Sequence, residues 1–263
     1  MIHYGKAEIS VYRTDGVRSL LGAEVQLDVF GENFMPAYTE GDNRLVVATD
    51  TMKNFVHAAA LGYDGESLEE LIELIGTRFL ETYAHVERIR VRARETPFAR
   101  KSDVLFQRSY DDAGVAELEL DRSGVLAERS GRVGLHLVKI TGSSFVQFAR
   151  DEFTTLPESV DRPLFIHLDV HWRHVDRARR VASTDVRESL TGTFDDFNSR
   201  SIQHLVHEMG TRLLDRFPEI AEVSFEGRNR LWDTAEVSEE DERVKVYTDP
   251  RPPYGMIGLT LRR

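Results

Sequence analysis

The sequence predicts an α+β protein of two similar halves, each with an antiparallel four-stranded sheet and two helices on one face. A segment that begins at Ile75 recurs from Met209, an offset of about half the 263-residue chain. Both copies carry apolar residues at the spacing of an amphipathic helix, and alternating segments flank each copy. We therefore divide the chain into two units, residues 1–129 and 130–263.

The two copies of the repeat each predict a helix of about four turns, over residues 68–83 and 202–217. Polar residues at the starts of these helices have the spacing of caps, and a proline ends the second one. The capping and terminating residues are Ser67 with Glu70 as a capping box for the first helix, and Ser199, Ser201 and Pro218 for the second.

Alternating polar and apolar residues predict the strands around these helices. They are residues 6–12, 25–30 and 86–92 in the first unit, and 133–139, 165–172 and 220–225 in the second. A turn at Asp15-Gly16 joins the first two strands. Thr49-Asp50 and Thr184-Asp185 each predict the cap of a short helix ahead of the long one. Because the strands are joined by hairpins, the sheets should be antiparallel.

The composition excludes several classes of protein. The chain has no cysteine, which rules out disulfides, a thiolate nucleophile and a cysteine-ligated zinc site. Its 34 Lys and Arg against 45 Asp and Glu give a net charge of -11, which disfavours nucleic-acid partners. No apolar run is long enough to cross a membrane and no secretory signal opens the sequence, so we expect a cytoplasmic location and no membrane partner.

The spacing of histidines gives a metal site as one alternative. His167, Asp169 and His171 share one face of a predicted strand, and His204 and His207 lie one helical turn apart. The same pattern is typical of the polar face of a strand, and the His-Glu-x-x-His motif is absent. Phosphate-binding glycine loops and the Gly-x-Ser-x-Gly elbow are absent too, so nucleotide binding and serine hydrolase chemistry have no support.

Three polar strings stand out from this scaffold. They are Tyr4-Gly5-Lys6, then Ala48-Thr49-Asp50-Thr51-Met52-Lys53-Asn54, and then Phe145-Val146-Gln147-Phe148-Ala149-Arg150-Asp151-Glu152-Phe153-Thr154-Thr155-Leu156 with Asp161-Arg162 downstream. Together they resemble urate oxidase (uricase), a cofactor-independent enzyme family of the tunnelling-fold (T-fold) superfamily. The resemblance extends to residues 247–255, and it agrees with the repeat, because that family's subunit is two T-fold units in tandem.

The resemblance implies an oxidoreductase of purine catabolism. It would convert urate, dioxygen and water to 5-hydroxyisourate and hydrogen peroxide without a cofactor. It also implies a homotetramer whose subunits close a β-barrel around a tunnel and share each active site. Other T-fold enzymes bind pterins or purines and often anchor the ring with a glutamate, whereas the matching positions here are Arg162 and Gln203.

The resemblance assigns the catalytic proton relay to Lys6 and Thr49. A lysine exchanges protons near neutral pH only if burial or a neighbouring cation lowers its pKa, so we expect Lys6 to be buried at the site. Substrate contacts are assigned to the ring of Phe145, the guanidinium of Arg162, the carboxamide of Gln203, the backbone of Ile202 and Asp50, and the side chains of Thr49 and Asn229. Without the resemblance, Phe145 would be a core residue, Arg162 a partner of Asp161, and Gln203 a helix-surface residue.

One position departs from the family. The family presents Asn-x-His after the first strand that follows the long helix of the second unit, with the histidine linked to the lysine and threonine. Here Asn229 supplies the amide, but Leu231 stands in the place of the histidine, and a shift of one residue would put Arg230 there. Neither side chain relays protons near neutral pH, so a non-catalytic purine-binding homologue is the alternative function.

Overall fold

The computed structural model describes residues 2–17 and 19–263 as a mixed α and β chain with antiparallel strand pairing. The chain divides into two compact units, Met1–Gly131 and Arg132–Arg263. The boundary predicted after residue 129 lies next to this division. Within the described ranges, none of the helices combines the length and the apolar content that crossing a bilayer needs.

Unit 1 contains one antiparallel sheet, two long helices and a small hairpin. The sheet has the order β1 (His3–Thr14), β2 (Leu20–Phe30), β3 (Arg88–Glu95) and β6 (Ala113–Asp121). The helices are η1 (Glu32–Phe34), α1 (Met35–Thr39), α2 (Thr49–Leu61) and α3 (Leu68–Thr82), and the hairpin is β4 (Phe98–Arg100) with β5 (Phe106–Arg108).

Unit 2 repeats this plan. Strand β7 (Gly124–Lys139) enters it from unit 1, and its sheet continues in the order β8 (Leu164–His174), β9 (Ile220–Asn229) and β12 (Gly255–Arg262). Its helices are η2 (Arg177–Arg179), α4 (Ser183–Asp196) and α5 (Ile202–Arg216), and its small hairpin is β10 (Asp233–Val237) with β11 (Lys245–Thr248). Among the described strands, β1 and β12 each have a neighbour on one side only.

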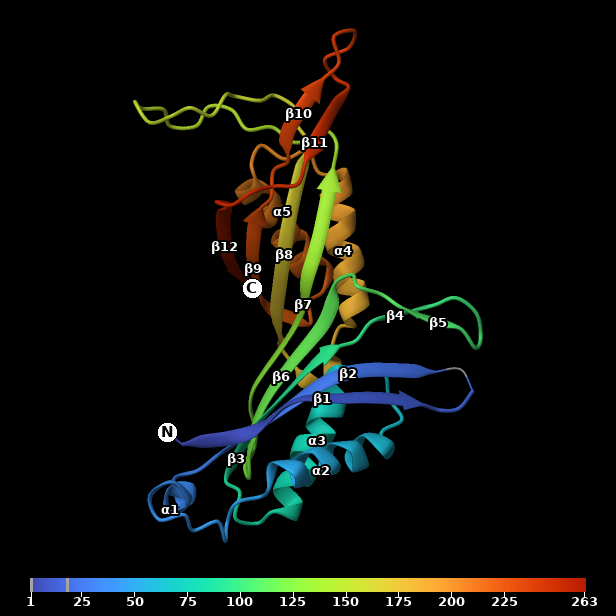
Figure 1. The fold of residues 1–263 in the computed structure, drawn as a ribbon, viewed down its shortest axis with the longest axis vertical. Coiled ribbons are helices and arrows are strands. Elements are labelled where there is room, and N and C mark those ends of the chain that lie inside the picture. The colour runs from blue at the N-terminus through green and yellow to red at the C-terminus, as the bar shows by residue number, and fades with distance from the viewer. Residues whose placement is uncertain (1, 18) are drawn as a thin grey trace. The chain divides into compact units, whose positions relative to one another are not determined.

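In each unit the helices cover one face of the sheet, as predicted (Figure 1). Strand β3 shows why. Its residues Ile89, Val91 and Ala93 are buried in the core of unit 1, whereas the arginines between them lie on the other face. There the arginine side chains pair with acidic ones: Arg88 and Arg90 with Glu119 at 3.2 and 2.9 Å, and Arg92 with Asp28 at 2.6 Å.

The glycine of the internal repeat marks the closest approach of helix to sheet. A Cβ atom on Gly76 of α3 would lie 2.7 Å from Cδ1 of Leu120, and one on Gly210 of α5 would lie 2.7 Å from Cδ1 of Leu261. Real Cβ atoms do not approach other atoms so closely, because packed interiors leave no such space. The repeat therefore preserves the packing of one helix on one sheet in both units.

The predicted caps are partly confirmed. Ser67 and Ser201 accept hydrogen bonds from the backbone N–H of Glu70 and His204, at 3.3 and 3.1 Å, as N-cap residues do. The reciprocal half of the capping box is wrong. The N–H of Ser67 donates to the hydroxyl of Tyr63 at 2.9 Å, and Tyr63 donates in turn to Glu70. Hydrogen bonds through Tyr63 therefore link Ser67 to Glu70, in place of the direct bond that a capping box would contain.

The prediction that Thr49-Asp50 and Thr184-Asp185 cap short helices is also wrong. Helices α2 and α4 have 13 and 14 residues, and their N-cap residues are Ala48 and Ala182, neither with a side-chain cap. Each helix begins at or before its threonine, α2 at Thr49 and α4 at Ser183. The threonines therefore lie inside the first turn and do not precede it. The first N–H groups of α2 therefore face outward from the helix without a side-chain cap.

Replacing Ser67 or Ser201 with alanine should lower the free energy of unfolding by about 1 kcal/mol each, because an orphan helix N–H loses its acceptor. Thr184→Ala is the matched control. Since Thr184 does not cap α4, this change should leave the stability within about 0.5 kcal/mol of the wild type. Urea denaturation of the three variants measures the differences, and an equal loss in all three would contradict the assignment of the caps.

Candidate active site

In unit 1, the Tyr4-Gly5-Lys6 string joins the start of β1 to the segment that precedes α2. The hydroxyl of Tyr4 accepts a hydrogen bond from the N–H of Val47 at 2.9 Å, and burial raises the pKa of this phenol. A Cβ atom on Gly5 would lie 2.2 Å from the backbone oxygen of Leu27 on β2. Only glycine permits this approach. The hydrogen bond of Tyr4 and the close contact at Gly5 therefore fix the backbone beside the site.

Lys6 lies at the last regular pair of β1 with β2 before a β-bulge. The register shifts between Lys6 and Ile9, and Glu8 has a φ of 56°, in the left-handed region. Lys6 is half-buried rather than buried. Bulges re-aim side chains at the margins of sheets, and here the bulge directly follows the predicted catalytic lysine.

Thr49 and Asp50 are the first two residues of α2. Both are exposed, and their N–H groups belong to the first turn, where no carbonyl of the helix can accept them. The pKa of Asp50 is lowered, chiefly by a hydrogen bond from Lys53 at 2.5 Å and to a smaller extent by the charge of Lys6. Unit 1 therefore places Lys6 close enough to the first turn of α2 for its charge to act on Asp50, the neighbour of Thr49.

In unit 2, Phe145 lies on an irregular arm formed by residues 143–162. Phe145 and Ser159 exchange two backbone hydrogen bonds, at 2.8 and 3.0 Å, which close the arm into a loop. At its base, Ser144 donates to the carbonyl of Ser199 at 2.8 Å, and Ser199 donates to that of Gly142 at 3.1 Å. These bonds connect the arm to the residues just before α5.

Arg162 ends the arm beside Phe145. Its guanidinium carbon lies 5.3 Å from the centre of the Phe145 ring. The Nε atom is buried without a hydrogen-bond partner, and burial lowers the pKa of the group, although an arginine remains protonated. The carboxylate of Asp161 accepts hydrogen bonds from the hydroxyl of Thr141 at 2.6 Å and the N–H of Gly142 at 2.8 Å. Asp161 thus holds the base of the arm.

Ile202 and Gln203 open α5 directly after the bridge at Ser199. Ile202 is buried and Gln203 is exposed, so an exposed helix-surface position still describes the glutamine in the isolated chain. Asn229 ends β9, and its Oδ1 atom is buried without a hydrogen-bond partner. Buried polar atoms normally find partners, so the unpartnered atoms of Asn229 and Arg162 are available to a ligand.

No histidine follows Asn229 within its segment. The backbone N–H of Arg230 donates to the carbonyl of Phe165 at 3.0 Å, and its guanidinium carbon lies 5.0 Å from the centre of the Tyr254 ring. Leu231 is half-buried. On the adjacent strand β8, the ring of His167 stacks on that of His136 at 3.7 Å, and burial, followed by the charge of His136, lowers the pKa of His167.

The residues of the metal alternative are engaged with protein groups. Asp169 accepts hydrogen bonds from the N–H of Gly134 at 2.7 Å and from Arg228 at 3.3 Å. Nδ1 of His204 accepts from the N–H of Arg200 at 3.3 Å. Across residues 2–17 and 19–263, no three His, Cys, Asp or Glu side chains are arranged to hold a metal ion.

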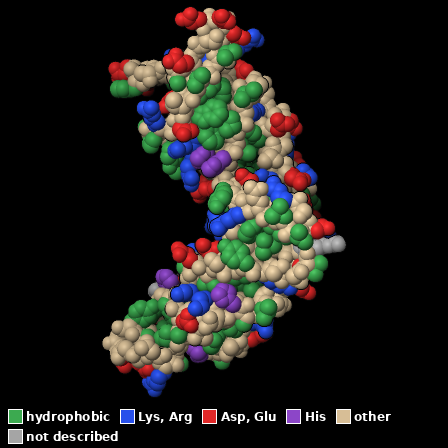
Figure 2. Space-filling view, turned by 45° about the vertical axis from the view of Figure 1, so that its right-hand side comes forward, with side chains coloured by type: hydrophobic (Ala, Val, Ile, Leu, Met, Phe, Trp, Pro, Cys, Tyr) green, Lys and Arg blue, Asp and Glu red, His purple; other side chains and the backbone are tan. Residues whose placement is uncertain are grey.

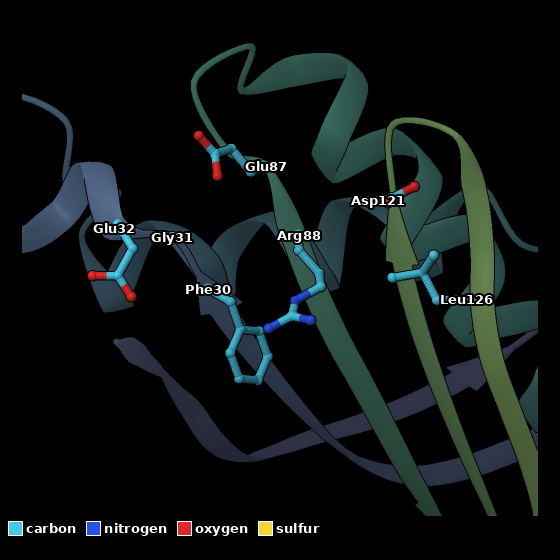
Figure 3. A pocket seen from close by; sticks show the side chains of 7 residues that line it. All are labelled: Phe30, Gly31, Glu32, Glu87, Arg88, Asp121 and Leu126. Carbon is cyan, nitrogen blue, oxygen red and sulfur yellow. The ribbon is translucent and has the colours of Figure 1, made fainter. Parts of the chain in front are cut away.

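A cavity of about 440 Å³ lies in unit 1, apart from the predicted site residues (Figure 3). Its lining residues are Phe30, Gly31, Glu32, Glu87, Arg88, Asp121 and Leu126. Three of them are carboxylates, and the guanidinium of Arg88 is paired with Glu119 and lies 5.0 Å from the Phe30 ring centre. This electrostatic setting disfavours an anion.

On the surface, acidic and basic side chains are interspersed over the face that Figure 2 shows. Local cations therefore decide where an anion binds.

Comparison with known proteins decides the family. The family model described as Uricase matches residues 2–117 and 128–258. The chain belongs to the uricase family. It is 38% identical to the uricase of Halalkalicoccus jeotgali, over 100% of this chain and 98% of that protein. The crystal structure of urate oxidase from Bacillus sp. TB-90 matches with a TM-score of 0.93 and 37% identity, over 100% of both chains.

The chain is also 36% identical to the bifunctional uric acid degradation protein of Bacillus subtilis, over 99% of this chain but only 60% of that protein. The chain therefore spans less than two thirds of that relative. The match of the uricase family model to both units confirms the resemblance drawn from the three polar strings.

Several residues that organise the site carry no sequence signal of their own. Lys139 donates to the carbonyl of Phe197 at 2.6 Å and so fixes the loop between α4 and α5, and burial lowers its pKa. Tyr4 and Asp161 stand inside recognised strings, but only contacts in space reveal their roles. The paired Asp-Arg of the signature was the one available hint for Asp161.

Asp161→Asn should loosen the arm in a pH-dependent way. The bonds from Thr141 and Gly142 lower the pKa of Asp161, so their stabilisation is present above the ordinary carboxyl pKa of 3.8 and disappears as the pH falls through the lowered value. Because the carboxylate is exposed, the loss at pH 7 should be below about 1 kcal/mol. Urea titrations at pH 7 and pH 3 should show a narrower gap between wild type and variant at pH 3, whereas exposed Asp64→Asn should give no gap.

Proposed function

We propose that this protein is a urate oxidase that converts urate, dioxygen and water to 5-hydroxyisourate and hydrogen peroxide without a cofactor. Membership of the uricase family supports the reaction. The observation that carries the proposal is the pair of Arg162 and Phe145, a half-buried cation with a buried, unpartnered Nε beside a half-buried ring. Such a pair suits a flat anionic bicycle with carbonyl oxygens along its edge.

The proposed binding mode gives each predicted substrate-binding residue one role. Urate stacks on Phe145 while the guanidinium of Arg162 holds one carbonyl edge. Gln203 and the backbone of Ile202 contact the opposite edge, at the N-terminus of α5. The free amide of Asp50 meets the five-membered ring, in keeping with its place in the first turn of α2.

Lys6 and Thr49 form the proposed proton relay. Removing a proton from bound urate gives a dianion, which passes two electrons to dioxygen and so becomes neutral dehydrourate. The reduced dioxygen takes up two protons, the one removed from urate and one from water, and leaves as hydrogen peroxide. The resulting dehydrourate takes up water, which Thr49 and Asn229 hold above the ring, and the new C–O bond completes 5-hydroxyisourate. The protein contributes position and proton transfer, while the reducing electrons come from the substrate.

We further propose that the two units are tandem T-fold units, residues 1–129 and 130–263, and that four subunits assemble with a β-barrel tunnel. The open outer edges of β1 and β12 support strand pairing between subunits. In this assembly Lys6 and Thr49 come from one subunit, and Phe145, Arg162 and Gln203 come from another. A cytoplasmic location remains part of the proposal.

Lys6→Ala should lower kcat for urate by about 10²- to 10⁴-fold, because the relay loses its proton-transferring group. Oxygen uptake and peroxide release from chelator-treated protein measure the loss. Lys101→Ala, in the loop between β4 and β5, removes an exposed lysine and is the control that should retain wild-type turnover. If the wild type binds urate but consumes no oxygen, the protein is the non-catalytic purine-binding homologue that Leu231 in place of histidine suggests.

Sharing of the site between subunits predicts complementation. Lys6→Ala and Arg162→Gln subunits should each form inactive assemblies. Mixed assemblies should regain about a quarter of wild-type activity, because one in four randomly formed sites combines the two intact halves. Co-expression with two affinity tags, followed by tandem purification and oxygen uptake, makes the measurement. No recovery in the mixed assemblies would mean that each site lies within one chain.

A further inference from the structure

The arm of residues 143–162 contains three successive contacts, Arg162 with Phe145, Phe145 with Phe148, and Phe148 with Arg150. The rings of Phe145 and Phe148 lie nearly parallel, with centroids 4.8 Å apart and an interplanar angle of 10°. The guanidinium carbon of Arg162 lies 5.3 Å from the centre of the Phe145 ring, and that of Arg150 lies 5.5 Å from the centre of the Phe148 ring. Phe148 and Arg150 belong to the uricase signature, and the proposed mechanism gives neither a task.

The backbone between the two rings is built to bring them together. Gln147 has a φ of 59°, in the left-handed region that residues with a side chain rarely adopt. Its N–H donates to the carboxylate of Glu158 at 2.9 Å, which holds the turn against the returning strand of the arm. The unusual conformation therefore has a dedicated partner, and it places Phe148 against Phe145 instead of leaving both rings to move independently.

We infer that Phe148 and Arg150 are positioning residues for urate binding. This inference rests on the proposed function. Phe148 backs one face of the Phe145 ring and Arg150 covers Phe148, so the ring that stacks on urate is already fixed before the substrate arrives. An aromatic ring that is held in its bound orientation does not pay for ordering when the ligand binds.

The test compares four single variants of the full-length protein. Phe148→Ala removes the backing ring, Phe148→Tyr keeps it, and Arg150→Met removes the outer cation. Phe153→Ala, in the same arm, is the matched control, because Phe153 is 81% exposed. For each, the Kd of urate is measured without oxygen by calorimetry, and KM and kcat are measured with oxygen. Thermal unfolding checks that the variants are folded, and Phe148→Leu replaces Phe148→Ala if that protein does not fold.

Phe148→Ala should raise both Kd and KM by about two- to tenfold, the equivalent of losing one aromatic stack. Arg150→Met should raise them by about two- to fivefold. In both variants kcat should stay within about twofold of wild type, since Lys6 and Thr49 are untouched. Phe148→Tyr and Phe153→Ala should match the wild type.

An unchanged Kd in Phe148→Ala, with the wild type active, overturns the inference and leaves the proposed function intact. A lower Kd also overturns it and means that Phe148 occupies the place of the substrate. A parallel fall in kcat, without restoration in Phe148→Tyr, would mean a general structural role. If the wild type neither binds nor oxidises urate, the proposed function fails, and the inference falls with it.

Discussion

The backbone bridge at Ser199 is the constraint on which the unit 2 half of the site depends. The arm of residues 143–162 has almost no regular secondary structure, so it can hold a shape only through individual hydrogen bonds. The bonds at Ser199 join the base of this arm to the start of α5, more than forty residues away in the sequence. Phe145, Arg162 and Gln203 keep a common geometry because their supports meet at this one point. Lys139 and Asp161 then reinforce it from the two sides.

The proposed site residues of unit 1 and those of unit 2 have different kinds of support. Lys6 lies within β1, just before its bulge, and Thr49 begins α2; the packing of both elements is set by the core of unit 1. Among the proposed substrate-binding residues of unit 2, Phe145 and Arg162 lie on irregular chain, whereas Ile202 and Gln203 open α5 and Asn229 ends β9. This division matches the demands of the proposed chemistry, because proton transfer needs tightly fixed distances, while a flat substrate is gripped by stacking and by a guanidinium at its edge.

Much of the fold could be predicted because its signals are local. The apolar stripes of α3 and α5, the alternation in β3 and the serines at two helix starts are all properties of a few neighbouring residues. The capping box failed where a distant side chain, Tyr63, took the N–H of Ser67. The starts of α2 and α4 were misjudged because their N-cap residues are alanines, which carry no capping signal.

The candidate site shows the same limit. The strings contain Phe145 and Arg162, and the resemblance implies Asn229, but the orphaned polar atoms of Arg162 and Asn229 depend on what surrounds them in space. In the sequence, Lys139 is an ordinary strand residue. Only the structure shows its hydrogen bond to the carbonyl of Phe197. The left-handed backbone conformation of Gln147 could not be predicted, because the position is neither glycine nor asparagine, the residues that usually adopt it. Contacts between distant segments are the part of the design that composition and periodicity do not contain.

The strands β1 and β12 have a consequence for the life of a newly made chain. Each presents backbone N–H and C=O groups on a side where no described strand of the same chain pairs with it. An open edge accepts any strand that comes near, whether from the correct partner or from a misfolded neighbour. With the proposed pairing of subunits through these edges, synthesis that outpaces assembly would favour aggregates, and slow expression would favour the paired form. The edges that would form the barrel therefore also expose the protein to aggregation until other strands pair with them.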